Sequence, residues 1–175
     1  MNRLKLNELY IQRFYKGIKR RLLSLPFKYS WSFSREGIRE RKRLEYFHNI
    51  HKGERCYLIA NGPSLSNIDL SFLQNKISIG LNRIYLLYKK YNFKNDYLVS
   101  INKLVLDQFK DDFNSLNVTK FLNWEIKQIF DEQSSNFFIY KSFFGGKFGK
   151  TMNKSINPAA TVNYEALQIA YFLGF

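Results

Sequence analysis

The stretch over residues 55–65 reads RCYLIANGPSL and carries the clearest fold signal of the chain. Its first half is a short apolar run, of the length and composition typical of a buried strand. Its second half breaks into four small or turn-forming residues. Asn61 and Gly62 tolerate a positive φ, Pro63 fixes its own φ, and Ser64 can cap a following helix. The stretch therefore predicts a strand, a tight turn and the start of a helix.

Two interpretations of this turn stay open. A strand that ends in such a turn leaves backbone N–H groups pointing into the space above its carboxyl end. In an α/β sheet this is where phosphate-bearing ligands bind. An ordinary strand-to-helix turn uses the same residue types, so the turn alone does not choose between the two.

The composition indicates a single globular domain of 175 residues, 45% of them hydrophobic. One cysteine, Cys56, excludes an intrachain disulfide, and its place in an apolar run favours a buried, inert thiol. With His48 and His51 as the only histidines, a Cys/His zinc site within the chain is not expected. The sequence predicts no metal site.

The net charge of +14 is unevenly distributed. Residues 1–55 carry 15 Lys and Arg against 5 Asp and Glu, whereas residues 56–175 carry 13 against 9. Because the basic character belongs mainly to the first third, we expect no nucleic-acid partner for the whole domain. No apolar run of about 18 residues and no apolar core of signal-peptide type is present, so we expect a cytoplasmic protein.

The first third predicts two basic helices. Residues 3–25 have an apolar stripe at three- and four-residue spacing, formed by Leu6, Leu9, Tyr10, Phe14, Ile18, Leu22 and Leu25. Such a helix can lie on an anionic membrane surface, at the inner face of the membrane, or pack on its own domain or on a partner chain, a homo-oligomer included. We expect Pro26 to end this helix and Ser34 to cap a second one over residues 35–51.

The remainder alternates strand and helix signals. The predicted strands are 55–60, 76–81, 96–101, 118–122 and 136–140, and the predicted helices are 68–74, 84–91, 103–113 and 161–172. This alternation predicts an α/β fold, a Rossmann-like, doubly wound and mostly parallel sheet with helices on both faces. The expected organisation is a basic helical extension over 1–52 and a nucleotide-binding domain over 53–175.

Three successive strands end in asparagine, at Asn61, Asn82 and Asn102. The carboxyl ends of parallel strands share one edge, and an Asn amide both donates and accepts hydrogen bonds, which suits nucleotide contacts. Asn is also common in ordinary turns. Arg83 could direct a charge at a phosphate or form a surface pair with an Asp.

Two later segments complete the predicted site. Residues 143–151, FFGGKFGKT, are not a P-loop, because Phe144 occupies the place of its first glycine. We expect a mobile loop over the site there. Residues 157–164, NPAATVNY, place small residues and Thr161 at a helix start, which can accept a phosphate or be capped by Thr161 itself.

These motifs carry a family resemblance. GERCYLIANGPSL (53–65), IGLNRIY (79–85), DYLVSIN (96–102) and TVNYEALQIAYFLGF (161–175) resemble the MptE-like family. That family is named for an archaeal 6-hydroxymethylpterin diphosphokinase and includes motility-associated glycosyltransferases. The same elements are similar to bacterial lipooligosaccharide sialyltransferases, which use a CMP-sugar donor in a Rossmann-like fold. The resemblance covers residues 53–175 and is weak from 110 to 155.

The resemblance implies a nucleotide site. It places the Asn61 turn around the donor phosphates, Asn82 and Asn102 against ribose or sugar, and Thr161 at a helix end facing the donor. The predicted binding residues are Asn61, Gly62, Pro63, Ser64, Asn82, Arg83, Asn102, Thr161 and Asn163. The family pattern continues with another strand and a ligand-side Asp, and the sialyltransferases carry their catalytic His beyond it. The resemblance therefore predicts a domain truncated at its C-terminus, without that base.

Three functions follow from this resemblance. The first is a glycosyltransferase that uses a nucleotide-sugar donor, of CMP-sialic acid type, and a surface-glycan acceptor, with no tightly bound cofactor. The second is a diphosphokinase, which needs Mg²⁺ and carboxylates near the phosphates. Asp96 lies at the wrong end of its strand for that, and Asp107 and Asp111 lie on a helix. The third is a non-catalytic nucleotide-binding fragment.

Overall fold

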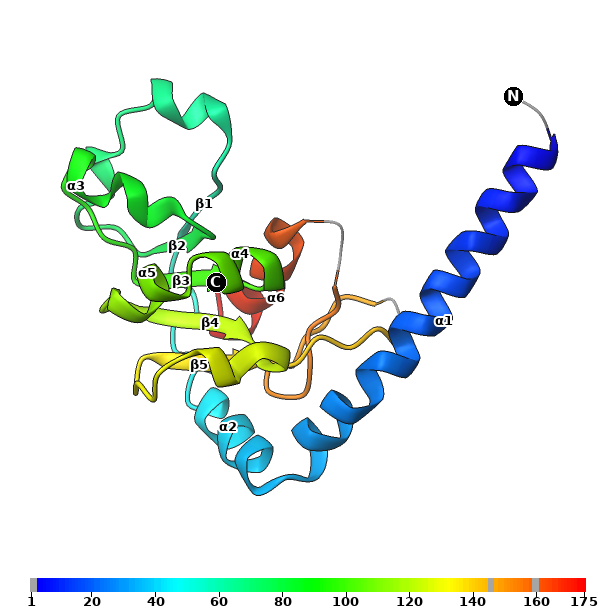
Figure 1. The fold of residues 1–175 in the computed structure, drawn as a ribbon. Coiled ribbons are helices and arrows are strands. Elements are labelled where there is room, and N and C mark those ends of the chain that lie inside the picture. The colour runs from blue at the N-terminus through cyan, green and yellow to red at the C-terminus, as the bar shows by residue number, and fades with distance from the viewer. Residues whose placement is uncertain (1–2, 145–146, 159–160) are drawn as a thin grey trace.

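The computed structural model describes residues 3–144, 147–158 and 161–175, and its fold is drawn in Figure 1. Five strands form one sheet: β1 (Tyr57–Ile59), β2 (Ser78–Leu81), β3 (Tyr97–Ser100), β4 (Thr119–Asn123) and β5 (Asn136–Ile139). All neighbouring strands are parallel. The predicted α/β fold with a parallel sheet is confirmed, and each strand lies where the sequence predicts one.

The strand order is sequential, β1-β2-β3-β4-β5, with no reversal among these strands. The doubly wound order expected from the sequence would include a reversal, and the crevice at that point is where such sheets bind ligands. Four connections run in the same direction along the sheet, and right-handed crossovers then place them all on one face. A ligand site in this sheet therefore needs other elements to enclose it.

The connections pack on that first face. They are η1 (Pro63–Asn67), η2 (Ser71–Leu73), η3 (Ile84–Leu87), α3 (Tyr88–Tyr91), α4 (Lys103–Gln108), α5 (Lys110–Ser115) and η4 (Trp124–Ile129). Their buried side chains, such as Leu73 and Phe113, pack with Ile59, Leu98 and Leu122 of the strands. The helix predicted over 68–74 is only the short 3₁₀ turn η2, because Leu70 and Leu73 alone are buried there.

The second face is covered by elements from the two ends of the chain, α2 (Arg35–Glu45) and α6 (Val162–Leu173). Leu44 of α2 and Ile169 of α6 belong to one buried cluster with Val99 and Phe121 of the strands. The sheet thus has helices on both faces, as predicted. Residues of the predicted N-terminal extension share this core.

The first helix, α1 (Arg3–Phe33), continues through Pro26, so the predicted end at Pro26 is wrong. A proline inside a helix removes one hydrogen bond and costs about 3 kcal/mol. Here the next turn is held by tertiary packing, because Trp31 is only 2% exposed and its ring contacts those of Trp124 and Tyr140 at centroid distances of 5.1 and 6.3 Å. Burial of that side chain offsets the missing bond.

The N-terminal half of α1 projects away from the sheet, as Figure 1 shows. The predicted stripe residues Leu6, Leu9 and Tyr10 have side chains outside the described set. Across the described parts of the chain, no helix is both long and apolar enough to pass through a bilayer.

The second helix begins as predicted and ends early. The Ser34 hydroxyl accepts a hydrogen bond from the Gly37 N–H at 3.0 Å, which confirms it as the N-cap. The helix ends at Glu45 instead of residue 51, so His48 and His51 lie in the following turns and not on a helix end. The helix ends early because a tertiary contact holds His51: its Nε2 lies 2.7 Å from the hydroxyl of Tyr97, with which it forms a hydrogen bond.

We expect Trp31→Ala to lower the free energy of unfolding by about 3–5 kcal/mol, because a fully buried indole is removed and a cavity remains. Phe33→Ala, on the same helix but 69% exposed, should change it by less than about 0.5 kcal/mol. Urea denaturation of both variants measures the difference. Equal effects would show that α1 is not anchored through Trp31.

Candidate functional site

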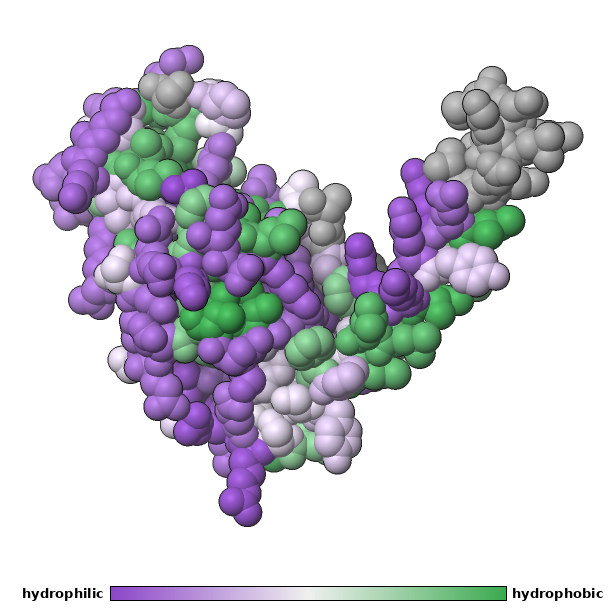
Figure 2. Space-filling view, in the orientation of Figure 1, coloured by the Kyte–Doolittle hydropathy of each residue, from purple (hydrophilic) through white to green (hydrophobic). Residues whose placement is uncertain are grey.

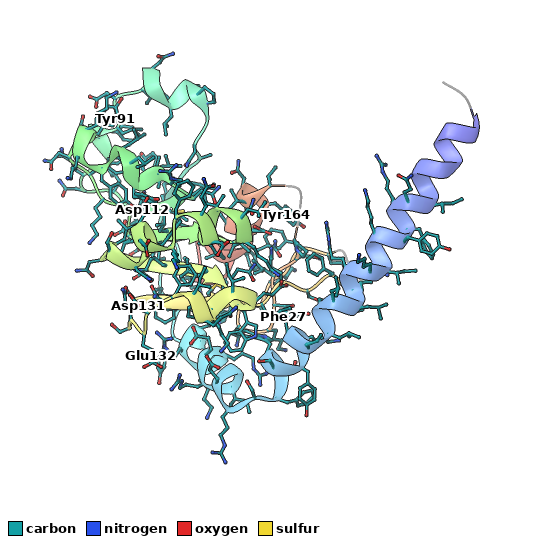
Figure 3. The ribbon with its side chains drawn as sticks, in the orientation of Figure 1. Phe27, Tyr91, Asp112, Asp131, Glu132 and Tyr164 are labelled. Carbon is teal, nitrogen blue, oxygen red and sulfur yellow. The ribbon has the colours of Figure 1, made fainter. Side chains whose placement is uncertain are left out.

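The candidate site is an open hollow of about 1000 Å³ over the carboxyl ends of the central strands. One wall is the edge of the sheet with the start of α6, and the other is α1. Phe27, labelled in Figure 3, lies where α1 reaches the body of the domain and lines the hollow. The hollow therefore exists only because α1 stands beside the strand ends.

Five cationic side chains line the hollow. Lys16, Lys19 and Arg20 come from α1, where spacings of three and four residues place them on neighbouring turns of one side. Lys103 comes from the start of α4, and Lys141 follows β5. Figure 2 shows the hydrophilic side of α1 turned toward the domain and its hydrophobic side turned away. This concentration of positive charge makes the hollow attractive to anions.

Two of the predicted asparagines line the hollow, Asn82 and Asn102. Asn82 has the left-handed backbone conformation, with φ 48°, and its Oδ1 accepts a hydrogen bond from the Ser100 hydroxyl at 3.2 Å. Asn102 caps α4, because its Oδ1 accepts from the Leu104 N–H at 3.0 Å. Each oxygen already accepts a hydrogen bond within the protein, and the Nδ2 group of each side chain is the donor that it can offer to a ligand.

A further strand-end asparagine, Asn123, links the end of β4 to the end of β3. It is fully buried, its Nδ2 donates to the Ile101 carbonyl at 3.0 Å, and its Oδ1 accepts from the Glu125 N–H at 3.0 Å. Asn123 is not among the site residues predicted from the sequence. The signal was present, since Asn123 directly follows the predicted strand 118–122, as Asn61, Asn82 and Asn102 follow theirs.

Two buried carboxylates also line the hollow, Glu125 and Glu165, and each is 6% exposed. Glu125 forms an ion pair with Lys103, and its Oε1 has no hydrogen-bond partner among the described residues. Burial raises the pKa of Glu165, and the charge of Lys141 opposes that rise. Burial lowers the pKa of Lys141, whose Nζ donates to the Ile101 carbonyl at 3.3 Å.

Lys103, Glu125, Lys141 and Glu165 are not among the site residues predicted from the sequence. They come from four distant segments, and no local pattern marks them as neighbours.

The start of the glycine-rich segment is held against α1. The guanidinium of Arg20 lies 5.3 Å from the centre of the Phe143 ring, and the ammonium of Lys28 lies 4.8 Å from that of Phe144. Arg21 Nε also donates to the Phe143 carbonyl at 3.3 Å. Residues 145–146 lie outside the described set, so the predicted loop motion stays a prediction.

The buried side chain of Gln168 fixes the path that leads into α6. Its Oε1 accepts from the N–H groups of Gly149 and Asn157, both at 2.8 Å. Its Nε2 donates to the carbonyls of Asn157 at 2.9 Å and Tyr164 at 3.2 Å. One amide thus ties both ends of the segment 149–157 to the helix that borders the hollow.

The Asn61 turn does not line the hollow. Asn61, Gly62, Pro63 and Ser64 are all exposed, at the end of the edge strand β1. Gly62 takes the N-cap position of η1 with φ −73°, so Ser64 is not the cap and neither Asn61 nor Gly62 has a positive φ. The 3₁₀ turn begins one residue after Gly62 because Pro63 suits the first helical position.

The other predicted residues divide between the hollow and the surface. Thr161 lines the hollow as the N-cap residue of α6, without a side-chain capping bond. Asn163 is exposed on α6 and does not line it. Arg83 stacks over the Phe109 ring at 3.6 Å and lies 4.0 Å from Asp112. This is the surface pair with an Asp that the sequence left open for Arg83.

In comparisons with known proteins, no family model, no curated protein and no solved structure matches the chain. The resemblance to the MptE-like family therefore stays a prediction, carried by the quoted motifs.

We expect Gln168→Leu to lower the free energy of unfolding by about 2–4 kcal/mol, because it leaves buried backbone groups without partners. Hydrogen exchange at the Gly149 and Asn157 amides should speed up in the same variant. Gln108→Leu, an exposed position on α4, serves as the matched control and should leave both unchanged. Unchanged exchange in Gln168→Leu would contradict the role given to this side chain.

Proposed function

We propose that the chain binds a nucleotide-sugar donor in the hollow and transfers its sugar to the hydroxyl of a glycan acceptor. The observation that carries this proposal is the set of five cationic side chains, with Asn82 and Asn102, around one hollow at the carboxyl edge of a parallel sheet. A ligand that suits this set has anionic phosphates for the cations and ribose or base edges for the amides.

The size of the hollow supports the same ligand class. A volume of about 1000 Å³ lies at the upper end of the range for small-molecule sites, where a nucleotide with an attached sugar fits and a lone phosphate does not fill the space. The N-terminus of α6, at Thr161, adds backbone N–H groups and a positive helix end to the same wall.

The transfer chemistry follows from the charged groups. The acceptor oxygen forms a bond to the anomeric carbon as the bond to the donor phosphate breaks, and the electron pair leaves with that phosphate. Lysine and arginine side chains stabilise the departing charge. The acceptor proton goes to a carboxylate, and we assign this general base to Glu165, because burial raises its pKa and makes it a stronger base than an exposed carboxylate.

The diphosphokinase alternative has weaker support. Its Mg²⁺ needs carboxylate ligands beside the phosphates. The two carboxylates in the hollow each interact with a lysine, Glu125 with Lys103 and Glu165 with Lys141. Within the described ranges, no group of three or more His, Cys, Asp or Glu side chains is placed to hold a metal ion.

Calorimetric titration of the full chain with CMP, CDP, UDP and ATP tests the proposal. We expect at least one of them to bind, and Lys19→Ala/Arg20→Ala to weaken that binding about tenfold or more, since charge-assisted hydrogen bonds contribute about 1.5–3 kcal/mol each. The matched control is Lys89→Ala/Lys90→Ala, two exposed lysines of α3 outside the hollow, which should leave the affinity unchanged.

Two results would contradict the proposal. The first is failure of all four nucleotides to bind. The second is an affinity that falls with Asn61→Ala but not with the Lys19/Arg20 variant, because the phosphates would then lie at the exposed turn after β1.

A further inference from the structure

One side of α1 carries a continuous apolar stripe that the domain leaves exposed. Its members recur every three or four residues and are between 38% and 69% exposed: Ile11, Phe14, Tyr15, Ile18, Leu22, Leu25, Tyr29 and Phe33. At 1.5 Å per residue the stripe is about 33 Å long. Isolated apolar residues on a surface are ordinary, but a continuous apolar patch of this length indicates an interaction surface.

The stripe lies opposite the side of α1 that the domain uses. At about 100° per residue, Arg20 and Trp31 fall on the reverse side from Ile11, Leu22 and Tyr29. The reverse side lines the hollow through Arg20 and buries Trp31 in the core. Figure 2 shows the same division, with hydrophobic side chains along the outer side of α1 and hydrophilic ones toward the domain. The stripe thus has no partner within the described chain.

The charges beside the stripe show which kind of surface it suits. Residues 9–35 include seven Lys and Arg and no Asp or Glu. By the same helical geometry, Lys19 borders the stripe on the side of the hollow. Arg21 and Lys28 border it on the other side, where both stay exposed beside Phe143 and Phe144. An apolar stripe bordered by cations is the pattern of helices that lie in the interface of an anionic bilayer.

A second copy of the chain suits the stripe less well. Helices that pair through an apolar seam place opposite charges across its borders. Here both borders are positive, so two copies of α1 would bring like charges together along the seam.

We propose that α1 lies in the interface of a membrane with anionic lipids, its apolar stripe in the acyl region and the exposed side chains of Arg21 and Lys28 at the headgroups. This inference stands independently of the nucleotide. Where the proposed function also holds, the hollow opens about one helix diameter, ~10 Å, from the headgroups. The acceptor class is then a glycan carried by a membrane lipid.

Co-sedimentation of the full chain with vesicles tests the inference. We expect binding to vesicles of phosphatidylcholine with 30% phosphatidylglycerol and at least tenfold weaker binding to phosphatidylcholine alone. Replacing Ile11, Ile18 and Leu22 with Gln should reduce binding to the anionic vesicles at least tenfold. The matched control replaces Ile68, Leu86 and Leu104, three exposed apolar residues outside α1, with Gln and should retain binding.

Three outcomes would overturn the inference: no binding to the anionic vesicles, equal binding to both vesicle types, or a stripe variant that binds as the unaltered chain does. Light scattering tests the alternative occupant, a second copy of the chain. A dimer of the unaltered chain that is lost in the stripe variant, together with no binding to vesicles, would assign the stripe to that second copy. Circular dichroism checks that each triple variant retains its helix content. Nucleotide titration of the stripe variant should give the unaltered affinity, which separates this test from that of the proposed function.

Discussion

The contact of Trp31 with Trp124 and Tyr140 is the interaction on which the candidate site depends. Trp124 directly follows Asn123 at the end of β4, and Tyr140 directly follows β5, so this contact joins α1 to the carboxyl edge of the sheet. The indole N–H also donates to the Lys154 carbonyl at 2.5 Å, which ties the same turn to the segment before α6. With this turn fixed, the preceding turns of α1 stand beside the strand ends.

The sequential strand order explains why such an anchor is needed. A sheet whose order reverses has a crevice at the reversal, and ligands bind in it. The order β1 to β5 has no reversal, so the strands alone form no such crevice. In this chain α1 and the start of α6 form the missing walls, and the cations of α1 supply much of the charge. One side of α1 lines the hollow, and the opposite, apolar side is the one for which we propose membrane contact.

The sequence predicts the sheet well because most of the strands are short and mainly apolar, and each of the first three is followed directly by an asparagine. It also predicts Asn82 and Asn102, since the rule that strand ends meet at one edge needs only the strand assignments. Asn123 follows from the same rule, extended by one strand. The turn after β1 does not reach the hollow because β1 is an edge strand. Its position at the edge follows only from the strand order, which the sequence does not give.

Other parts of the site lie beyond local patterns. The rule that proline ends a helix is local, and the burial of Trp31 that overrides it joins residues far apart in the chain. Lys16, Lys103, Glu125 and Glu165 are ordinary helix or turn residues by sequence, and only tertiary packing brings them together. From the sequence, Gln168 is an ordinary polar residue of a helix. In the structure it is fully buried and makes four hydrogen bonds to backbone groups.

We propose that α1 and the strand ends form one anion-binding site. A crystal structure of the full chain with bound CDP tests it most directly, because it locates the phosphates. We expect them between Lys19 and Arg20 of α1 on one side and Asn102 with the start of α6 on the other. Phosphates bound at the Gly62–Ser64 turn, with no contact to α1, would contradict a site formed by α1 and the strand ends.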